Sequence, residues 1–194
     1  MRLRKRIWTT VLGLGLFAGL GVSVAGFWIG GDPSGSRLDR IEGSSHYEKG
    51  AFFNPERQAP FEITWDYLKE QFFGTQIRVP PESVPVMVID PESLGVAPPP
   101  GLRTTWLGHA GAMIEIDGSR VLIDPVFSEY ASPFQFVGPK RFHPPPIALS
   151  DLTGIDAVVI SHDHYDHLDR ATIRHLAPQG TRFFVPLGVG THLA

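Results

Sequence analysis

The sequence contains no cysteine among its 194 residues. This absence excludes disulfide bridges, Cys-ligated zinc and a thiol nucleophile, and it is compatible with any redox compartment. The chain also has little net charge, because 17 Lys and Arg stand against 20 Asp and Glu. The residues after position 31 form a net-acidic body, whereas proteins that bind nucleic acid obtain most of their affinity from Lys and Arg. We therefore expect no nucleic-acid partner.

Charged residues are also absent from a long apolar stretch near the N-terminus. Residues 7–29 carry no charge and follow four basic residues at positions 2–6. A run of this length can span a bilayer as a helix with its basic flank on the cytoplasmic side. The small residues of Ser23-Val24-Ala25 also suit a signal peptidase, so residues 1–31 are predicted to be a signal peptide or a membrane anchor. The protein is then membrane-associated through this segment, or exported (periplasmic if bacterial).

Glycine, serine, proline and charged residues dominate the next part of the chain, residues 32–100, which we expect to be an extension and linker. Within it, the apolar spacing from Ile63 to Phe73 predicts a short amphipathic helix with Thr64 as its cap. The proline-rich residues 79–100 predict an extended connector.

From Gly101 to Ala194 the pattern is typical of an α/β domain. Strands are predicted at 102–107, 112–116, 119–123, 156–160 and near 182–186, and a helix at 169–176 with Asp169 as its N-cap. Asp117-Gly118 is a hairpin signal. The proline-containing loop at 128–150 is longer than an ordinary connection in a compact domain, so we expect it to have a functional role.

Four metal-binding side chains lie within six positions after the predicted strand at 156–160, namely His162, His164, Asp166 and His167. A packed core avoids this density because each buried polar group needs a partner. Strand ends are the usual place for chemistry in an open α/β sheet. His162 and His164 are two positions apart, so they project to the same side of an extended backbone. With a carboxylate and a third imidazole beside them they suit two divalent cations, and we predict a metal site.

Loop segments as well as the metal motif carry a family resemblance. They include Thr105-Trp106-Leu107-Gly108-His109-Ala110 and Leu122-Ile123-Asp124-Pro125-Val126-Phe127, and also residues 50–55, 131–133, 138–142, 155–162 and 184–188. In this order they resemble the N-acylphosphatidylethanolamine-hydrolysing phospholipase D group within the metallo-β-lactamase fold. The resemblance covers about residues 46–194.

The resemblance implies an α/β fold, the metallo-β-lactamase αββα sandwich. Residues 101–194 would supply its N-terminal half, preceded by a membrane segment and a Pro-rich extension. It also implies a zinc-dependent phosphoric diester hydrolase with two Zn²⁺ per complete site. His162 and His164 would bind the first zinc and Asp166 and His167 the second, and Asp166 would also orient the activated hydroxide. The substrate would be a membrane phospholipid with an N-acylated ethanolamine head.

The family's remaining ligands are not found before Ala194, so we expect a fragment with low activity on its own. The alternatives are another metallo-β-lactamase-fold ester or lactone hydrolase, or a truncated chain without activity.

Four further residues are candidates for the site. Within this fold Asp124 is expected to brace the metal loop by a hydrogen bond, the alternative being a simple turn residue. His109 lies in a Gly-rich turn at the same sheet edge, where lining the site and a local hydrogen bond are both open. Gln135 and Phe136 occupy the family's Gln-Tyr position near the lipid head group, and Phe136 lacks the tyrosine hydroxyl.

Overall fold

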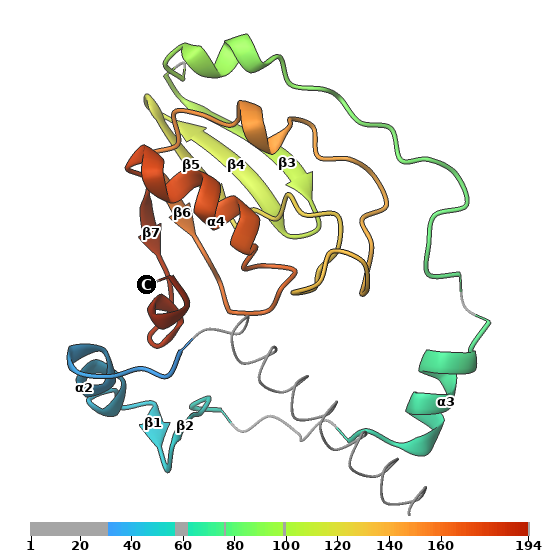
Figure 1. Cartoon of the computed structure of the whole chain (residues 1–194), viewed down its shortest axis with the longest axis vertical. Coiled ribbons are helices and arrows are strands. Elements are labelled where there is room, and N and C mark those ends of the chain that lie inside the picture. The colour runs from blue at the N-terminus through green and yellow to red at the C-terminus, as the bar shows by residue number, and fades with distance from the viewer. Residues whose placement is uncertain (1–30, 57–61, 76, 99, 194) are drawn as a thin grey trace, which may run out of the picture.

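The computed structural model describes residues 31–56, 62–75, 77–98 and 100–193 (Figure 1). The expected signal peptide or membrane anchor lies outside these ranges, apart from Gly31. In the described part of the chain, no helix combines the length and the apolar character needed to cross a membrane.

The part expected to be a linker contains short regular elements. Helix α2 (Ser36–Glu42) is followed by the two-residue strands β1 (Tyr47–Glu48) and β2 (Ala51–Phe52), which pair antiparallel. Ile41 is buried, and a Cβ built on Gly188 would lie 3.5 Å from its Cδ1, so α2 packs near the C-terminal end of the described chain. Two-residue strands and a two-turn helix are too short to produce a periodic signal, which is why the sequence suggested a linker.

The predicted amphipathic helix is confirmed as α3 (Trp65–Phe73). The Thr64 hydroxyl accepts a hydrogen bond from the Tyr67 amide at 3.1 Å, as expected of an N-cap. The described residues between α3 and a short 3₁₀ helix, η1 (Pro91–Gly95), form no helix or strand.

A five-stranded mixed sheet forms the centre of the fold. Its strands are β3 (Leu102–Gly108), β4 (Gly111–Ile116), β5 (Ser119–Ile123), β6 (Ala157–Val159) and β7 (Arg182–Phe184), in that spatial order. The pairs β3–β4 and β4–β5 are antiparallel, and β5–β6 and β6–β7 are parallel. The turn between β4 and β5 holds Asp117 at φ 47° and Gly118 at φ 88°, the positive values that a tight hairpin of this type requires.

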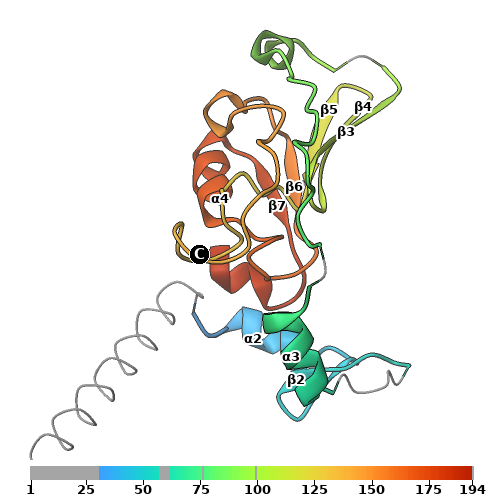
Figure 2. The same ribbon diagram turned by 90° about the vertical axis from the view of Figure 1, so that its right-hand side faces the viewer.

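One face of the sheet is covered by helix α4 (Arg170–Leu176), as the two orthogonal views show (Figures 1 and 2). Alternate strand residues point to this face, so Leu107, Met113, Leu122 and Val158 are buried together with Leu176. Short 3₁₀ turns η2 (Leu149–Asp151), η3 (Ala177–Gln179) and η4 (Val189–Leu193) complete the described elements. The expected α/β class is confirmed, and the complete αββα sandwich stays a prediction.

A buried ionic network joins the connector to this sheet. The Glu115 carboxylate accepts hydrogen bonds from Arg103 and, at 3.1 Å, from Arg120, which is itself only 3% exposed. The Arg120 guanidinium also donates to the carbonyls of Leu94 and Val96, both at 2.6 Å. The hydrogen bond from Arg103 lowers the pKa of Glu115; burial opposes this shift, and Arg120 adds to it. The network therefore fixes η1 against the sheet.

Candidate metal centre

The metal motif lies where β6 ends and the chain turns toward α4. The amides of His167 and Leu168 both donate to the His164 carbonyl, at 2.9 and 2.7 Å, so the second half of the motif, from His164 to His167, is a turn. This turn still gathers the imidazoles, because the His162 ring centroid is 4.5 Å from that of His164 and 4.0 Å from that of His167. The His162 ring is thus in contact with the rings of both other predicted histidine ligands.

Asp166, the fourth predicted ligand, contacts a neighbouring histidine of the motif. Its Oδ2 lies 3.7 Å from Nε2 of His167, and its side chain is 40% exposed. The Asp166 side chain is thus partly accessible, whereas that of His167 is only 16% exposed.

Asp124 contacts the motif from the end of β5. Because β5 and β6 are parallel, they end at the same sheet edge, and Asp124 lies beside Ser161. Its carboxylate accepts hydrogen bonds from the Ser161 amide and hydroxyl, both at 2.7 Å, and from Nδ1 of His167 at 2.9 Å. Burial acts to raise the pKa of Asp124, but the hydrogen bonds from His167 and Ser161 prevail and leave the pKa below its ordinary value.

This contact determines which nitrogen of His167 is available. A carboxylate that accepts from Nδ1–H fixes the tautomer in which Nε2 carries a free lone pair, the usual arrangement behind metal-binding histidines. Nε2 is the atom that faces Asp166. The geometry matches the bracing role expected of Asp124.

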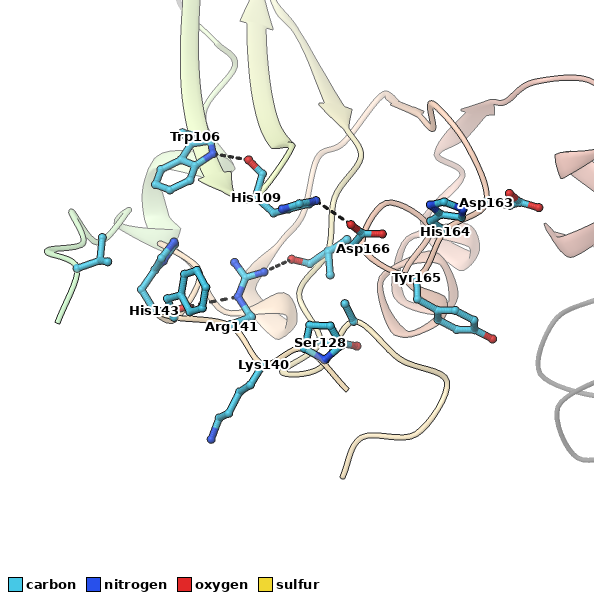
Figure 3. Close-up of a pocket in the computed structure, with 15 residues that line it drawn as sticks. Trp106, His109, Ser128, Lys140, Arg141, His143, Asp163, His164, Tyr165 and Asp166 are labelled. Atoms are coloured by element: carbon cyan, nitrogen blue, oxygen red, sulfur yellow. Dashed lines mark hydrogen bonds and ion pairs between the residues drawn. The ribbon is translucent and has the colours of Figure 1, made fainter. Parts of the chain in front are cut away.

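His109 reaches the motif from the turn between β3 and β4. Its Nε2 lies 2.9 Å from Oδ2 of Asp166, and its carbonyl accepts a hydrogen bond from Nε1 of Trp106 at 2.9 Å (Figure 3). The structure therefore shows both contacts that the sequence left open. The His109 side chain contacts the site, and the His109 backbone carbonyl is hydrogen-bonded within the turn.

Gln135 and Phe136 lie away from the motif. The Gln135 amide is bonded within its own loop, to the Tyr130 amide and carbonyl and to the Ser132 carbonyl, at 3.1–3.2 Å. Phe136 is 80% exposed, and neither residue lines the cavity described next. Their role in substrate binding stays a prediction.

A cavity of about 910 Å³ opens beside the motif (Figure 3). His109, His164 and Asp166 line it together with their neighbours Asp163 and Tyr165. The other walls are mainly apolar and basic, with one hydroxyl from Ser128: Val84, Trp106, Val126, Ser128, Ala131, Pro139, Lys140, Arg141, Phe142 and His143. Lys140 pairs with Glu129 at 2.7 Å. The composition suits a ligand with a substantial apolar part.

Arg141 shapes the cavity wall. Its guanidinium donates to the carbonyls of Val126 and Leu107, both at 2.8 Å, and burial lowers its pKa. A Cβ at Gly108 would lie 2.6 Å from Nη2 of Arg141, so glycine is required there both for space and for the backbone φ of 107°. Arg141 thus fixes the turn that carries His109.

Asp169 contributes more than the predicted helix cap. It does accept from the Ala171 amide at 3.2 Å, which confirms the N-cap of α4. The same carboxylate also accepts from the amides of Phe127 and Ser128, both at 2.9 Å, and from the Ser128 hydroxyl at 2.7 Å. These bonds join the loop after β5 to α4 across about forty positions, and no local pattern in the sequence indicates them.

Comparison with known proteins agrees with this geometry. Residues 119–194 match the Beta-lactamase superfamily domain. An uncharacterized protein of Mycobacterium tuberculosis is 39% identical over an alignment of 193 residues, in a match that covers 93% of this chain and 52% of the relative. N-acyl-phosphatidylethanolamine-hydrolyzing phospholipase D 1 of Caenorhabditis elegans is 48% identical over 92 residues, 46% of this chain and 26% of that enzyme. A UPF0173 metal-dependent hydrolase of Metallosphaera sedula is 41% identical over 63 residues, 32% of this chain and 23% of that protein.

The resemblance expected from the sequence is therefore confirmed. The chain is related to N-acyl-phosphatidylethanolamine-hydrolyzing phospholipase D and to metal-dependent hydrolases. The match to the Beta-lactamase superfamily domain includes the metal motif. It covers about half the length of the mycobacterial relative.

Proposed function

We propose that this chain carries the metal-binding part of a zinc-dependent phosphoric diester hydrolase of the N-acylphosphatidylethanolamine phospholipase D type. One observation carries the proposal: the metal motif lies at the edge of the cavity, because His164 and Asp166 both line the cavity. The relatedness to a phospholipase D of this type supports the choice of reaction. Because the chain covers 52% of the mycobacterial relative, the reaction is proposed for the whole protein to which such a chain corresponds.

The donor atoms fit the metal. Imidazole nitrogen and carboxylate oxygen are ordinary ligands of Zn²⁺, and a braced histidine such as His167 is typical of its sites. His162 and His164 would hold one ion and Asp166 and His167 the other. When bound, such ions lower the pKa of water and stabilise the charge that develops on a phosphoryl group.

The protein's own residues then have defined tasks. Asp124 keeps Nε2 of His167 unprotonated and directed at the site. Asp166 is placed to accept a hydrogen bond from the attacking oxygen, since its carboxylate lies at the cavity surface. The apolar wall that includes Trp106 and Phe142 would exclude water and accommodate the apolar part of the substrate.

The remaining parts of the proposal concern location. Residues 1–31 would act as a membrane anchor or as a signal peptide, and residues 32–100 would connect them to residues 101–194, the N-terminal half of the catalytic domain. An anchor would keep the site at the lipid surface, where the phospholipid substrate is found. Localisation of a fusion carrying residues 1–31, compared with one that begins at residue 32, tests this part.

The activity test uses the purified full chain with Zn²⁺ and vesicles that contain N-acylphosphatidylethanolamine. Release of N-acylethanolamine that disappears in His164→Ala but persists in His46→Ala would support the proposal, because His46 lies outside the motif, just before β1. Parallel assays with a lactone and a simple carboxylic ester test the rival hydrolase. Zinc binding without turnover of any of the three substrates would favour a chain that is inactive by itself.

A further inference from the structure

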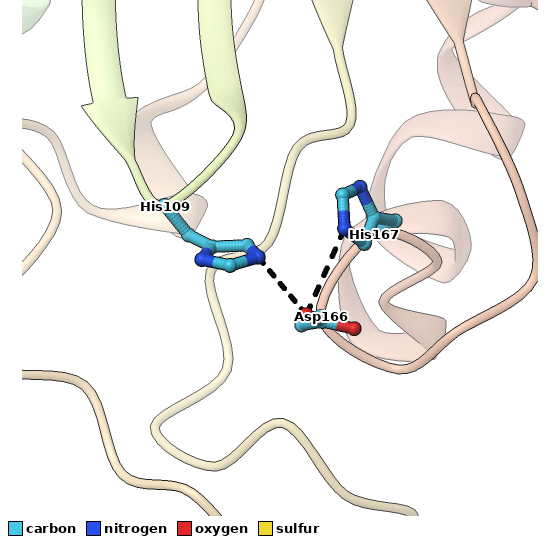
Figure 4. A group of neighbouring side chains, drawn as sticks. All are labelled: His109, Asp166 and His167. Carbon is cyan, nitrogen blue, oxygen red and sulfur yellow. Dashed lines mark ion pairs between the residues drawn. The ribbon is translucent and has the colours of Figure 1, made fainter. Parts of the chain in front are cut away.

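The turn between β3 and β4 presents a third metal-binding side chain to Asp166 and His167 (Figure 4). One donor atom from each of His109, Asp166 and His167 can be chosen so that all three lie within 4.8 Å of one another. Asp166 is central, because its Oδ2 lies 2.9 Å from Nε2 of His109 and 3.7 Å from Nε2 of His167. The sequence separates His109 from Asp166 by the whole of β4, β5 and β6.

These distances are close to what one bound ion requires. Zinc–nitrogen and zinc–oxygen bonds are about 2.0–2.2 Å long, so two donors on the same tetrahedral ion are about 3.4 Å apart. The two observed separations from Asp166, 2.9 and 3.7 Å, lie on either side of this value. Changes of about half an ångström would bring each histidine to this spacing from Asp166, and the separation between the two histidine donors, which is within 4.8 Å, would adjust when an ion binds.

The His109 side chain is held in this direction by its backbone. His109 has a φ of 49° in the tight turn between the paired strands β3 and β4, where positive values are ordinary. Its carbonyl is bound by Trp106, and the preceding Gly108 packs against Arg141, which is anchored to two carbonyls. The side chain of His109 is thus 56% exposed, while the backbone that carries it is held in place by these contacts.

We propose that His109 is a protein ligand of the ion held by Asp166 and His167. The inference rests on the proposed function in one respect, namely that Asp166 and His167 bind a metal. Two imidazoles and one carboxylate with an open fourth position are a donor set used by catalytic zinc and by other first-row divalent ions. The described chain would then offer a three-ligand site for one ion.

The competing explanation is that His109 only donates a hydrogen bond to Asp166 and orients it. Glutamine separates the two cases, because its amide can still donate to a carboxylate but is not among the usual zinc ligands. The experiment measures Zn²⁺ affinity of the full chain by competition with a chromophoric chelator, in the wild type, His109→Ala, His109→Gln, Asp166→Asn and the control His46→Ala. The visible absorption of the Co²⁺-loaded proteins provides a second readout of the ligand set.

We expect His109→Ala and His109→Gln to weaken the Asp166-dependent Zn²⁺ binding by at least about tenfold, the lower end of what loss of a ligand's partner already costs. Both should change the Co²⁺ absorption, and His46→Ala should match the wild type. Unchanged affinity in His109→Ala, or recovery of wild-type affinity and spectrum in His109→Gln, would overturn the inference.

The same measurements keep this inference separate from the proposed function. Metal binding that depends on His164 and Asp166 but not on His109 would refute only the role of His109. Binding that depends on His109 and Asp166, in a chain that hydrolyses none of the three substrates, would support His109 as a ligand and favour a chain that is inactive by itself.

Discussion

Asp124→Asn tests how far the metal centre depends on a residue that cannot itself reach the ion. The aspartate carboxylate accepts three hydrogen bonds, two from Ser161 and one from His167. Asparagine has the same shape but only one acceptor oxygen. If that oxygen keeps the Ser161 amide, the side-chain NH₂ faces Nδ1 of His167 and favours the tautomer with a proton on Nε2. That proton occupies the position needed for a metal.

Two independent magnitudes can be attached to this change. Removing the hydrogen-bond partner of a metal-binding histidine typically costs 10–100-fold in metal affinity, or about 1.4–2.7 kcal/mol. Hydrogen bonds to charged groups are worth about 1.5–3 kcal/mol, which is the same range. We therefore expect Zn²⁺ affinity to fall by about 30-fold in Asp124→Asn.

The assay is chelator competition on the full chain, with circular dichroism to confirm that the variant is folded. Asp156→Asn is the matched control, because Asp156 also accepts a backbone hydrogen bond, from Arg120 at 2.7 Å, but lies outside the motif. Ser161→Ala removes one Asp124 contact and keeps the His167 contact, so it should lose much less affinity. A folded Asp124→Asn protein with wild-type affinity would refute the reasoning about the His167 tautomer.

Three other predictions concern stability. Arg120→Met should lower the free energy of unfolding by about 3–5 kcal/mol, because it leaves the buried polar partners of Arg120 without a hydrogen-bond donor. Arg103→Met removes a half-exposed partner of the same Glu115 and should lower the stability much less; equal losses in urea denaturation would contradict this. Because the pKa of Glu115 is lowered on folding, its stabilising contribution is present above about pH 4 and lost as the pH falls further, so Glu115→Gln should flatten the acid side of a Tm–pH profile; an unchanged slope would show that other carboxylates dominate. Gly108→Ala should destabilise by about 1–3 kcal/mol, because a Cβ meets Arg141 and the φ is positive, while the open position Gly95 should tolerate alanine in the same thermal unfolding assay.

Local patterns predicted much of the fold and the metal motif. The hairpin at Asp117-Gly118, the cap at Thr64 and the strand before His162 all follow from neighbouring residues, and all are present. Contacts between distant segments could not be predicted in the same way. The pairing of His109 with Asp166 depends on the register of four strands, which sequence periodicity does not specify. The extra hydrogen bonds of Asp169 depend on where the loop after β5 meets α4.

The strained φ angles among the described residues indicate where contacts within the protein constrain the backbone most strongly. Non-glycine residues with positive φ are Lys49, His109, Asp117 and Asp124. Lys49 and Asp117 are in tight turns between paired strands, where such values are ordinary. Asp124 follows β5 and precedes a proline, a position that favours extended backbone, so its φ of 40° is costly, by about 1–3 kcal/mol. Its three hydrogen bonds to Ser161 and His167 oppose that cost. Asp124 is therefore held in the conformation that directs Nε2 of His167 toward Asp166 by the protein's own contacts.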